Sequence, residues 1–434
     1  MGRARRATAV AAAVAAAALA GAPAASAAGE TTHAFMAERA IAHLPDGPLR
    51  TLLSAQRLHV LGGAGYPDTG YWVENGAIPV RGLEPRPSDD FGEASHWEPF
   101  VDAYVAHVRA KDCGDLSLPA GPCAHLVAHL MGAAAHGMGD EVWDWLFEPR
   151  VTDHGEDAAL NFFAEGRPGH ALDGNPLDEA SSSIEYAMDE VAIFYHARWL
   201  SPNTAPPPVT DLVSVYERMG LAVTPEHVLA GHAVSSGAMA AERAVAPIEA
   251  PRVRADMPWS TEHFVTEPGG VEYTARAIAG HYEALWHKLT EPAHPAPRPV
   301  AVHPKPNARG VPHVWQPPRT SPGPHSGGGE QRVLAVLSNA VDSASVGPGT
   351  FRLLAADGTD VPPLPSFPKA GPYGADQGTH TLLFYPATNL EPCARYTAVL
   401  TTGLRDRTGA PLEREHRWSF TTRPASGPPG TGCR

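Results

Sequence analysis

Apolar residues recur at intervals of three and four through most of the chain between about Thr31 and Leu289. The clearest examples are Ala124–Leu146 and Val271–Leu289, where this spacing places apolar side chains along one face of a helix. Strand-like alternation of apolar and polar residues is scarce in this region. We therefore predict an all-α domain that ends near residue 290.

Beyond residue 330 the pattern changes to short runs rich in Val, Leu, Tyr, Phe and Thr. Turn signals such as Asp357-Gly358 and Thr408-Gly409 separate the runs, which is typical of a small β-sandwich. The expected strands are Val333–Leu337, Phe351–Leu354, Thr381–Tyr385, Tyr396–Thr401 and Trp418–Thr422. We expect this all-β domain to span residues 331–423, followed by a short tail at 424–434.

Residues 291–330, between the two predicted domains, are rich in proline and include the run Ser-Gly-Gly-Gly at 326–329. Such a composition buries too little apolar surface to fold, so we interpret the segment as a semi-rigid linker. Its histidines, His303, His313 and His325, are then expected to be solvated.

Composition agrees with a folded chain of more than one domain. The sequence has 434 residues, of which 43% are hydrophobic, while 42 glycines and 45 prolines mark many turns and linkers. Acidic residues outnumber basic residues by 47 to 33, which gives a formal net charge of -14. This balance argues against a nucleic-acid partner, because proteins that neutralise many phosphates do so with clustered Lys and Arg.

The first 27 residues are typical of a secretory signal peptide. Three arginines within the first six residues precede the apolar run Ala7–Ala20, and small residues follow up to Ala27. A membrane anchor is the alternative, but the run is shorter than the ~20 residues that a span needs, and no later segment is long and apolar enough. We expect a secreted or cell-surface protein whose first domain covers residues 28–290.

Four cysteines, Cys113, Cys123, Cys393 and Cys433, are consistent with export. In an oxidising compartment an even number favours disulfides, and proximity in sequence favours Cys113 with Cys123 and Cys393 with Cys433 over the two other connectivities. A thiolate metal site is the weaker alternative, because the sequence contains no C-x2-C pair.

Candidate chemistry begins with His136 and Asp140, which lie four residues apart in a predicted helix. This spacing puts both side chains on one helix face, where they can reach the same cation, and Asp144 extends the stripe by another turn. Small residues around His136 leave room for another backbone or a buried ion. Taken alone, such a pair more often marks a surface ion pair or a packed core histidine than a metal site.

Further motifs occur in a specific order: Thr32-His33, then GAGYPD with Asp68, then ASHWEPF with His96, then HLMGAAAHGMGDEVW. With these motifs the segment from Ala28 to Leu289 resembles the zinc-dependent phospholipase C family, whose relatives include single-strand nucleases. The N-terminal domain of glycosylphosphatidylinositol-specific phospholipase D looks closest. The resemblance implies an all-α phospholipase C/nuclease-like domain with a cleft that holds three metal ions, usually zinc.

Carried over to this sequence, the resemblance implies two well-defined metal sites. Asp68, His96, His136 and Asp140 would bind the first ion. The amine and carbonyl of Ala28, freed by signal cleavage, would bind the second ion together with His33 and Asp140. Removal of the signal peptide would then be part of enzyme maturation.

At the third site the sequence departs from the family pattern, because Asp144, Glu185 and Asp189 stand where the family has mostly histidines. Carboxylate oxygens suit harder cations than zinc, so this site is expected to hold a different ion or none. The alternative places Glu185 and Asp189 on an exposed helix face. His154 and His170 are possible substitute ligands, whereas His125 and His129 are expected to pack or to lie at the rim.

The implied activity is hydrolysis of a phospholipid or related phosphodiester by water that several metal ions activate, with Asp68 as the catalytic residue that orients or deprotonates this water. Four aromatic residues could line the substrate cleft or belong to the core: Tyr66, Tyr71, Trp72 and Trp97. Peripheral membrane or cell-surface contact would follow. The alternatives are a non-catalytic, metal-stabilised surface or interaction protein with a degenerate third site, and a single-strand nuclease.

The C-terminal domain has its own resemblance. The segments Val333–Asp342, Gly403–Gly409 and Trp418–Thr422 resemble a bacterial immunoglobulin-like domain of the surface-protein type. Such domains act as spacers or adhesive units, and this one shows no cluster of catalytic residue types. A disulfide between Cys393 and Cys433 would fix its C-terminal tail.

Overall fold

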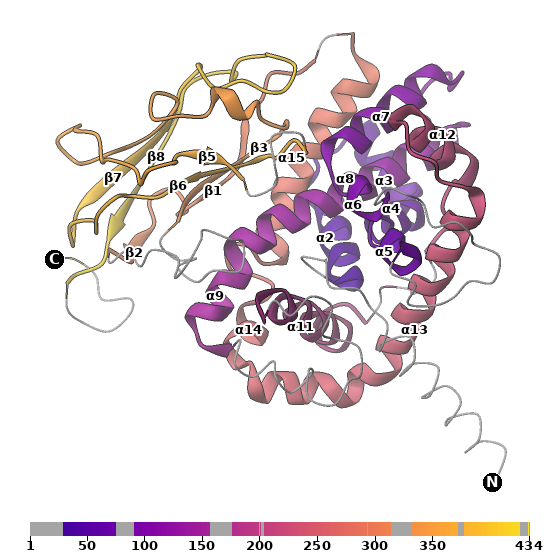
Figure 1. Ribbon diagram of the computed structural model, residues 1–434, viewed down its shortest axis with the longest axis horizontal. Coiled ribbons are helices and arrows are strands. Elements are labelled where there is room, and N and C mark those ends of the chain that lie inside the picture. The colour runs from indigo at the N-terminus through magenta and orange to yellow at the C-terminus, as the bar shows by residue number, and fades with distance from the viewer. Residues whose placement is uncertain are drawn as a thin grey trace.

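The chain folds into a helical domain and a β-sandwich domain that pack against each other (Figure 1). The computed structural model describes residues 29–74, 91–156, 176–198, 200, 204–292, 294–313, 332–371, 377–425 and 433. The predicted signal peptide and Ala28 lie outside these residues. No helix among the described residues has the length and apolar character needed to cross a membrane.

Helices make up the N-terminal domain, as the apolar spacing predicts. Their bounds are α2 (Glu30–His43), α3 (Pro48–Ala55), α4 (Arg57–Ala64), α5 (Thr69–Glu74), α6 (Phe91–Ser95), α7 (Glu98–Ala110), α8 (Ala124–Val142), α9 (Glu148–Asp153), α11 (Pro176–Val191), α12 (Val209–Met219), α13 (Pro225–Asp256), α14 (Pro258–His263) and α15 (Val271–Thr290). Two π-helical turns, Trp143–Phe147 and Ala192–His196, continue α8 and α11.

Helix α8 lies at the centre of the domain, with nearly all of its residues buried. Glycines bring α4 very close to it, as the small residues of this helix predict. A Cβ on Gly63 would lie 2.1 Å from the carbonyl oxygen of His129, and one on Gly132 would lie 2.1 Å from that of Val60. Since real Cβ atoms do not approach this closely, any side chain at either position would push the two helices apart.

The β-sandwich consists of two four-stranded sheets. Its strands are β1 (Pro299–His303), β2 (Arg309–Val311), β3 (Val333–Leu337), β4 (Phe351–Leu354), β5 (Lys369–Ala370), β6 (Thr381–Phe384), β7 (Arg395–Leu400) and β8 (His416–Thr422). The first sheet has the order β1-β3-β6-β5 with antiparallel pairs, and the second has the order β2-β8-β7-β4, in which β2 runs parallel to β8. All five strands expected from the sequence are present, with ends that differ by two residues at most.

The predicted linker over residues 291–330 requires correction, because β1 and β2 both lie inside it. Strand β1 is an edge strand that pairs with β3 alone, and Pro299 is its first residue, a position where a missing N–H group is tolerated. His303 is therefore buried, with only 7% of its surface exposed, rather than solvated. The sandwich domain begins before residue 300.

The two domains share an apolar core. Leu334, Val336 and Leu383 of the sandwich belong to the same buried cluster as the helical core. Helix α15 packs directly on β1, where a Cβ on Gly280 would lie 2.3 Å from Cγ1 of Val300. The sandwich is thus held against the helices by side-chain packing.

Buried polar contacts also cross this interface. The fully buried guanidinium of Arg332 donates a 2.6 Å hydrogen bond to the carbonyl oxygen of Trp145. The carboxylate of Glu141 on α8 accepts hydrogen bonds from the backbone N–H groups of His380 and Thr381 at 2.8 and 2.9 Å. Such bonds satisfy groups that burial would otherwise leave unpaired.

Both predicted disulfides are confirmed. Cys113 pairs with Cys123 next to the start of α8, and Cys393 pairs with Cys433 at the C-terminal end of the sandwich. Each bridge lies within one domain.

Candidate metal centre

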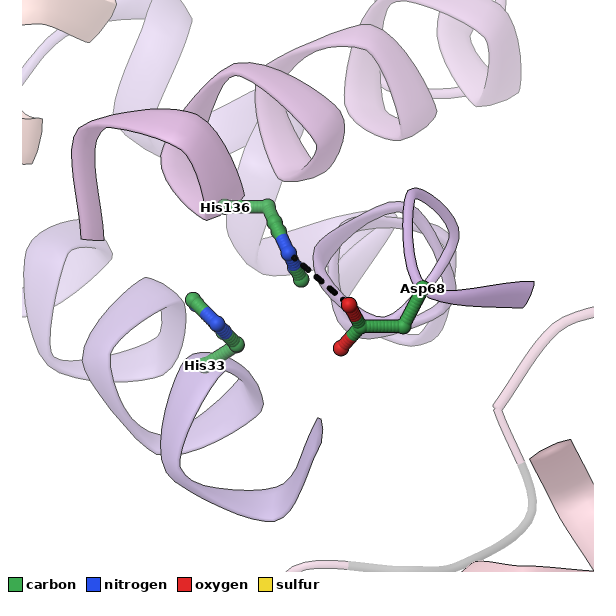
Figure 2. A group of neighbouring side chains, drawn as sticks. All are labelled: His33, Asp68 and His136. Carbon is green, nitrogen blue, oxygen red and sulfur yellow. Dashed lines mark ion pairs between the residues drawn. The ribbon is translucent and has the colours of Figure 1, made fainter. Parts of the chain in front are cut away.

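Five of the predicted ligands meet inside the helical domain, and we call them the helical cluster: His33, Asp68, His96, His136 and Asp140. His33 comes from α2 and His136 and Asp140 from α8, while Asp68 lies between α4 and α5 and His96 directly follows α6. All five are buried. Figure 2 shows His33, Asp68 and His136 pointing toward one space between the helices.

The two carboxylate oxygens of Asp140 face different sets of histidines. Its Oδ1 lies 3.0 Å from Nε2 of His33. Its Oδ2 lies 3.4 Å from Nε2 of His136 and 3.9 Å from Nε2 of His96. Asp140 thus presents one oxygen to each set of histidines.

Asp68 completes the group on one side of this bridge. Its Oδ1 lies 3.3 Å from Nε2 of His96 and 3.5 Å from Nε2 of His136. The His136 ring also stacks on the ring of His33, with centroids 3.6 Å apart. Imidazole and carboxylate atoms therefore surround one small volume.

The outer nitrogens of two histidines are fixed by backbone carbonyls. Nδ1 of His136 donates to the carbonyl oxygen of Ala64 at 2.6 Å, and Nδ1 of His96 donates to that of Gly92 at 2.7 Å. When the rings are neutral, these bonds place the lone pair of each on Nε2, the arrangement that metal-binding histidines adopt. Nε2 of His136 makes no hydrogen bond although it is buried. This donor set fits zinc.

The shifted pKa values within the helical cluster show that it favours added positive charge. Burial raises the pKa of Asp140 to about 7, against the opposing effect of His136 and His96. Burial also disfavours charge on Asp68 and His96. The contact between them and the charges of His136 and Asp140 have the opposite and larger effect. The pKa of Asp68 falls well below its usual range, and that of His96 rises to about 9. Protons on these groups reduce the repulsion between the buried carboxylates, and a bound metal ion would displace them.

Glycines of α8 make room for the neighbouring ligands. A Cβ on Gly139 would lie 2.8 Å from Nδ1 of His33, and one on Gly137 would lie 2.0 Å from the carbonyl oxygen of His96. The His-Gly-Met-Gly-Asp segment therefore carries two ligands and also admits two others from separate elements.

The predicted third-site residues are arranged differently. Asp144, Glu185 and Asp189 are all buried, so the alternative of an exposed helix face is wrong for Glu185 and Asp189. Within the described ranges, none of the three belongs to a group of three ligand atoms lying within 4.8 Å of one another. Ala28, the predicted terminal ligand, lies outside the described residues.

Asp189 has a structural partner. Its carboxylate accepts hydrogen bonds from the backbone N–H groups of Thr31 and Thr32 at 3.0 and 2.7 Å, and from the Thr32 hydroxyl at 2.5 Å. It thereby caps the N-terminus of α2, whose own N-cap residue, Gly29, has no side chain to do so. A Cβ on Gly29 would lie 2.4 Å from Cγ of Asp189, so this capping also requires a glycine.

Glu148 is a nearby acidic residue that the sequence analysis did not include. It is 1% exposed, and together with Asp144 it adds to the effect of burial in raising the pKa of Glu185 well above its usual range. The signal was the continued four-residue spacing from His136 through Asp140 and Asp144 to Glu148. Asp144 lies in the π-helical turn that follows α8, and Glu148 is the first residue of α9.

Two of the other histidines considered as ligands pack against aromatic side chains. His129 packs in the core against Tyr66 and Tyr104, as expected. His154 stacks on the ring of Trp259 with centroids 4.1 Å apart, and His170 lies outside the described residues.

The aromatic residues proposed for substrate binding divide into two kinds. Tyr66 is a core residue whose hydroxyl donates to that of Tyr216 at 3.1 Å. Tyr71 and Trp97 lie beside His96, with ring centroids 5.1 and 6.0 Å from it, and both donate hydrogen bonds to Glu93. The side chain of Trp72 lies outside the described residues.

Comparison with known proteins supports the assignment of the C-terminal domain. Residues 296–422 match the family model described as bacterial Ig-like domain. No curated protein matches the chain. The family match begins at residue 296 and β1 begins at Pro299, in agreement with the corrected boundary.

Solved structures that align with the chain include those of a surface layer protein, SbsC. A structure of its domains 1-6 has a TM-score of 0.20 at 13% identity, covering 85% of this chain and 46% of that one. One of its N-terminal part has a TM-score of 0.21 at 14% identity, covering 87% of this chain and 79% of that one. The chain thus spans less than half of the first of these structures, and scores this low do not indicate a shared fold.

Proposed function

We propose that this chain is an exported metal-dependent phosphodiesterase that hydrolyses phospholipid or related phosphodiester bonds. The observation that carries the proposal is the position of Asp140, whose two oxygens face His33 on one side and His96 and His136 on the other. A bridging carboxylate between two imidazole sets is what a two-ion hydrolytic site requires.

In such a site two zinc ions would be held by the helical cluster, and they would activate water and neutralise charge on the phosphate. The chain's own residues supply the positioning. Carbonyl contacts from Ala64 and Gly92 fix the rings of His136 and His96. Because His136 and His96 hold the pKa of Asp68 well below its usual range, Asp68 is suited to bind and orient rather than to accept a proton.

The substrate side of the proposal rests on Tyr71 and Trp97. Both lie beside His96, and Glu93 fixes both through hydrogen bonds of 2.6 and 2.7 Å. Aromatic faces bind quaternary ammonium headgroups. Tyr71 and Trp97 are each 6% exposed, so a headgroup would reach them only from within the helical domain. With a formal net charge of -14, the chain favours a phospholipid over a nucleic acid as substrate.

Two observations support an extracellular or cell-surface location. The C-terminal domain matches a bacterial Ig-like family, and all four cysteines form disulfides. In this proposal the Ig-like domain carries the catalytic domain at the cell surface.

The test is hydrolysis of a chromogenic phosphorylcholine ester by the mature chain, with and without a chelator. We expect zinc-dependent turnover that the chelator abolishes and zinc restores. Inositol lipids and single-stranded DNA serve as parallel substrates, and preference for DNA would replace the phospholipase assignment with a nuclease. Bound zinc without hydrolysis of any of the three would contradict the enzymatic proposal.

A second candidate is a non-catalytic surface protein in which the helical cluster binds metal for stability. The observation that favours it is the capping role of Asp189, whose two oxygens are engaged by Thr31 and Thr32. This candidate predicts bound zinc and a higher unfolding temperature with zinc, but no turnover.

A further inference from the structure

A second group of possible ligands lies where the two domains meet, and we call it the interdomain cluster: Glu98, His281 and His380. Glu98 is the first residue of α7, His281 lies on α15, and His380 directly precedes β6. All three are buried, with exposed fractions of 7, 2 and 4%. Each offers a ligand atom within 4.8 Å of the other two.

Both histidine rings are oriented by backbone carbonyls of adjacent residues. Nδ1 of His281 donates to the carbonyl oxygen of Ser338 at 2.9 Å, and Nδ1 of His380 donates to that of Leu337 at 3.0 Å. A carbonyl can only accept, so in the neutral form of each ring the lone pair lies on Nε2. The rings stand edge to face with centroids 4.5 Å apart, and two imidazole lone pairs are thereby brought into one buried place.

Glu98 adds an oxygen to this pair. Its Oε2 lies 3.3 Å from Nε2 of His380, which equals the spacing of about 3.3 Å between ligands of a tetrahedral zinc with bonds of roughly 2.0–2.1 Å. Its Oε1 accepts a hydrogen bond from Lys288 at 3.1 Å. Lys288 also contacts Asp102, so its charge is shared between two carboxylates. One Glu98 oxygen is thus turned toward the histidines.

We propose that Glu98, His281 and His380 bind a zinc ion that joins the helical domain to the Ig-like domain. Two nitrogens and one carboxylate oxygen form a donor set typical of zinc. A cavity of about 30 Å³, lined by His281, Lys288 and Asn339 among others, adjoins the cluster and has room for a water molecule as fourth ligand. Zinc binding at this cluster is independent of the proposed enzymatic function.

The ion would have two ligands on helices and one on the sandwich. Zinc binding would therefore stabilise the arrangement of the two domains, because the complete ligand set exists only when they are packed together. The carbonyls of Leu337 and Ser338 belong to the sandwich as well, so the orientation of His281 also depends on that packing.

Anomalous diffraction at the zinc edge, from crystals of the mature full-length chain grown with zinc, tests the site without any substitution. We expect an anomalous peak between Glu98, His281 and His380. Peaks at the helical cluster with none between the domains would overturn the proposal while leaving the enzymatic proposal standing.

Zinc stoichiometry provides the second test. After chelation and dialysis, the chain carrying both His281→Gln and His380→Gln should bind one zinc ion fewer than the unmodified chain. His287→Gln is the matched control, since His287 lies exposed on the same helix and should leave the stoichiometry unchanged. The double variant should keep phosphodiester hydrolysis. Equal zinc content in the double variant and the unmodified chain would contradict the proposal.

Discussion

The helical and interdomain clusters orient their histidines in the same way but differ in their carboxylates. In both, Nδ1 groups donate to backbone carbonyls and Nε2 atoms converge. The helical cluster has two acidic side chains, and Asp140 presents one oxygen to each of two sides. The interdomain cluster has only Glu98, whose Oε1 accepts a hydrogen bond from Lys288.

This difference predicts different functions for the two clusters. Two carboxylates without a bound lysine allow two cations to lie close together, which is the requirement for hydrolysis of a phosphodiester. One carboxylate beside a lysine allows a single ion with three protein ligands. Such an ion would stabilise the packing of the two domains. Variants that affect one cluster and spare the other therefore test the distinction.

The largest expected effect is that of Asp140→Asn. The amide removes the charge and one anionic oxygen from the bridge, so both cation positions weaken together. We expect phosphodiester hydrolysis to fall by about 10³-fold, because metal-ion catalysis contributes several kcal/mol. Steady-state assays with the phosphorylcholine ester measure this fall, and Asp46→Asn, at an exposed surface carboxylate, is the control. Unchanged turnover would show that Asp140 does not bridge catalytic ions.

Lys288→Met tests the interdomain cluster instead. The substitution leaves Glu98 buried without its cation, which should lower the free energy of unfolding by about 3 kcal/mol. Zinc should restore more stability in this variant than in the unmodified chain, because the competing ammonium is gone. Denaturant unfolding with and without zinc measures both effects. Lys111→Met, at a more exposed ion pair with Asp211, is the control, and a variant that zinc fails to stabilise would argue against the interdomain ion.

The residues of the helical cluster were predictable from the sequence and those of the interdomain cluster were not, for one physical reason. His136 and Asp140 share a helix, where spacing alone places side chains together. Asp68 and His96 reach them only through the fold, and they were found through the resemblance to a known family. Glu98, His281 and His380 come from three distant segments of two domains, and no periodicity in the sequence relates them.

The predicted linker is a second region whose structure does not follow from its local sequence. Its proline content predicted an unfolded spacer, yet β1 forms there because β3 offers an exposed edge and α15 offers an apolar face. Tertiary partners of this kind override composition. The strands β3 and β4, by contrast, were predicted with their observed ends, since their apolar runs and turn signals are local.

A smaller effect is expected from Gly139→Ala. The added methyl group would lie 2.8 Å from Nδ1 of His33 and displace this ring from Asp140. Loss of alignment at one ligand typically costs about 10–100-fold in metal affinity or activity. Activity and zinc affinity should fall accordingly, while interdomain stability should not change. Gly237→Ala on α13 is the matched control, because its Cβ would meet no atom within 4 Å, and this variant should be as active as the unmodified chain.

The smallest effect is a difference in pH dependence between the clusters. Without metal, the hydrogen bond to Asp68 and the charge of Asp140 outweigh burial and raise the pKa of His96 to about 9, while burial raises that of Asp140 to about 7. At neutral pH His96 is therefore protonated and Asp140 is about half protonated. Zinc must displace these protons, so zinc affinity falls as the pH falls through these values. The dependence is about tenfold per pH unit for each proton displaced.

In the interdomain cluster, burial lowers the pKa of His281 to about 3, so this ligand releases no proton. Contact with Glu98 outweighs burial and raises the pKa of His380, so His380 is the one ligand here that would release a proton. Zinc titrations between about pH 6 and 8 should therefore be steeper for the helical cluster than for the interdomain cluster. The chain with His281→Gln and His380→Gln reports the helical cluster alone, and the Asp140→Asn chain reports the interdomain cluster. Equal pH dependence of zinc affinity in the two chains would mean that the helical cluster releases no more protons than the interdomain cluster. The proposed electrostatic difference between them would then be wrong.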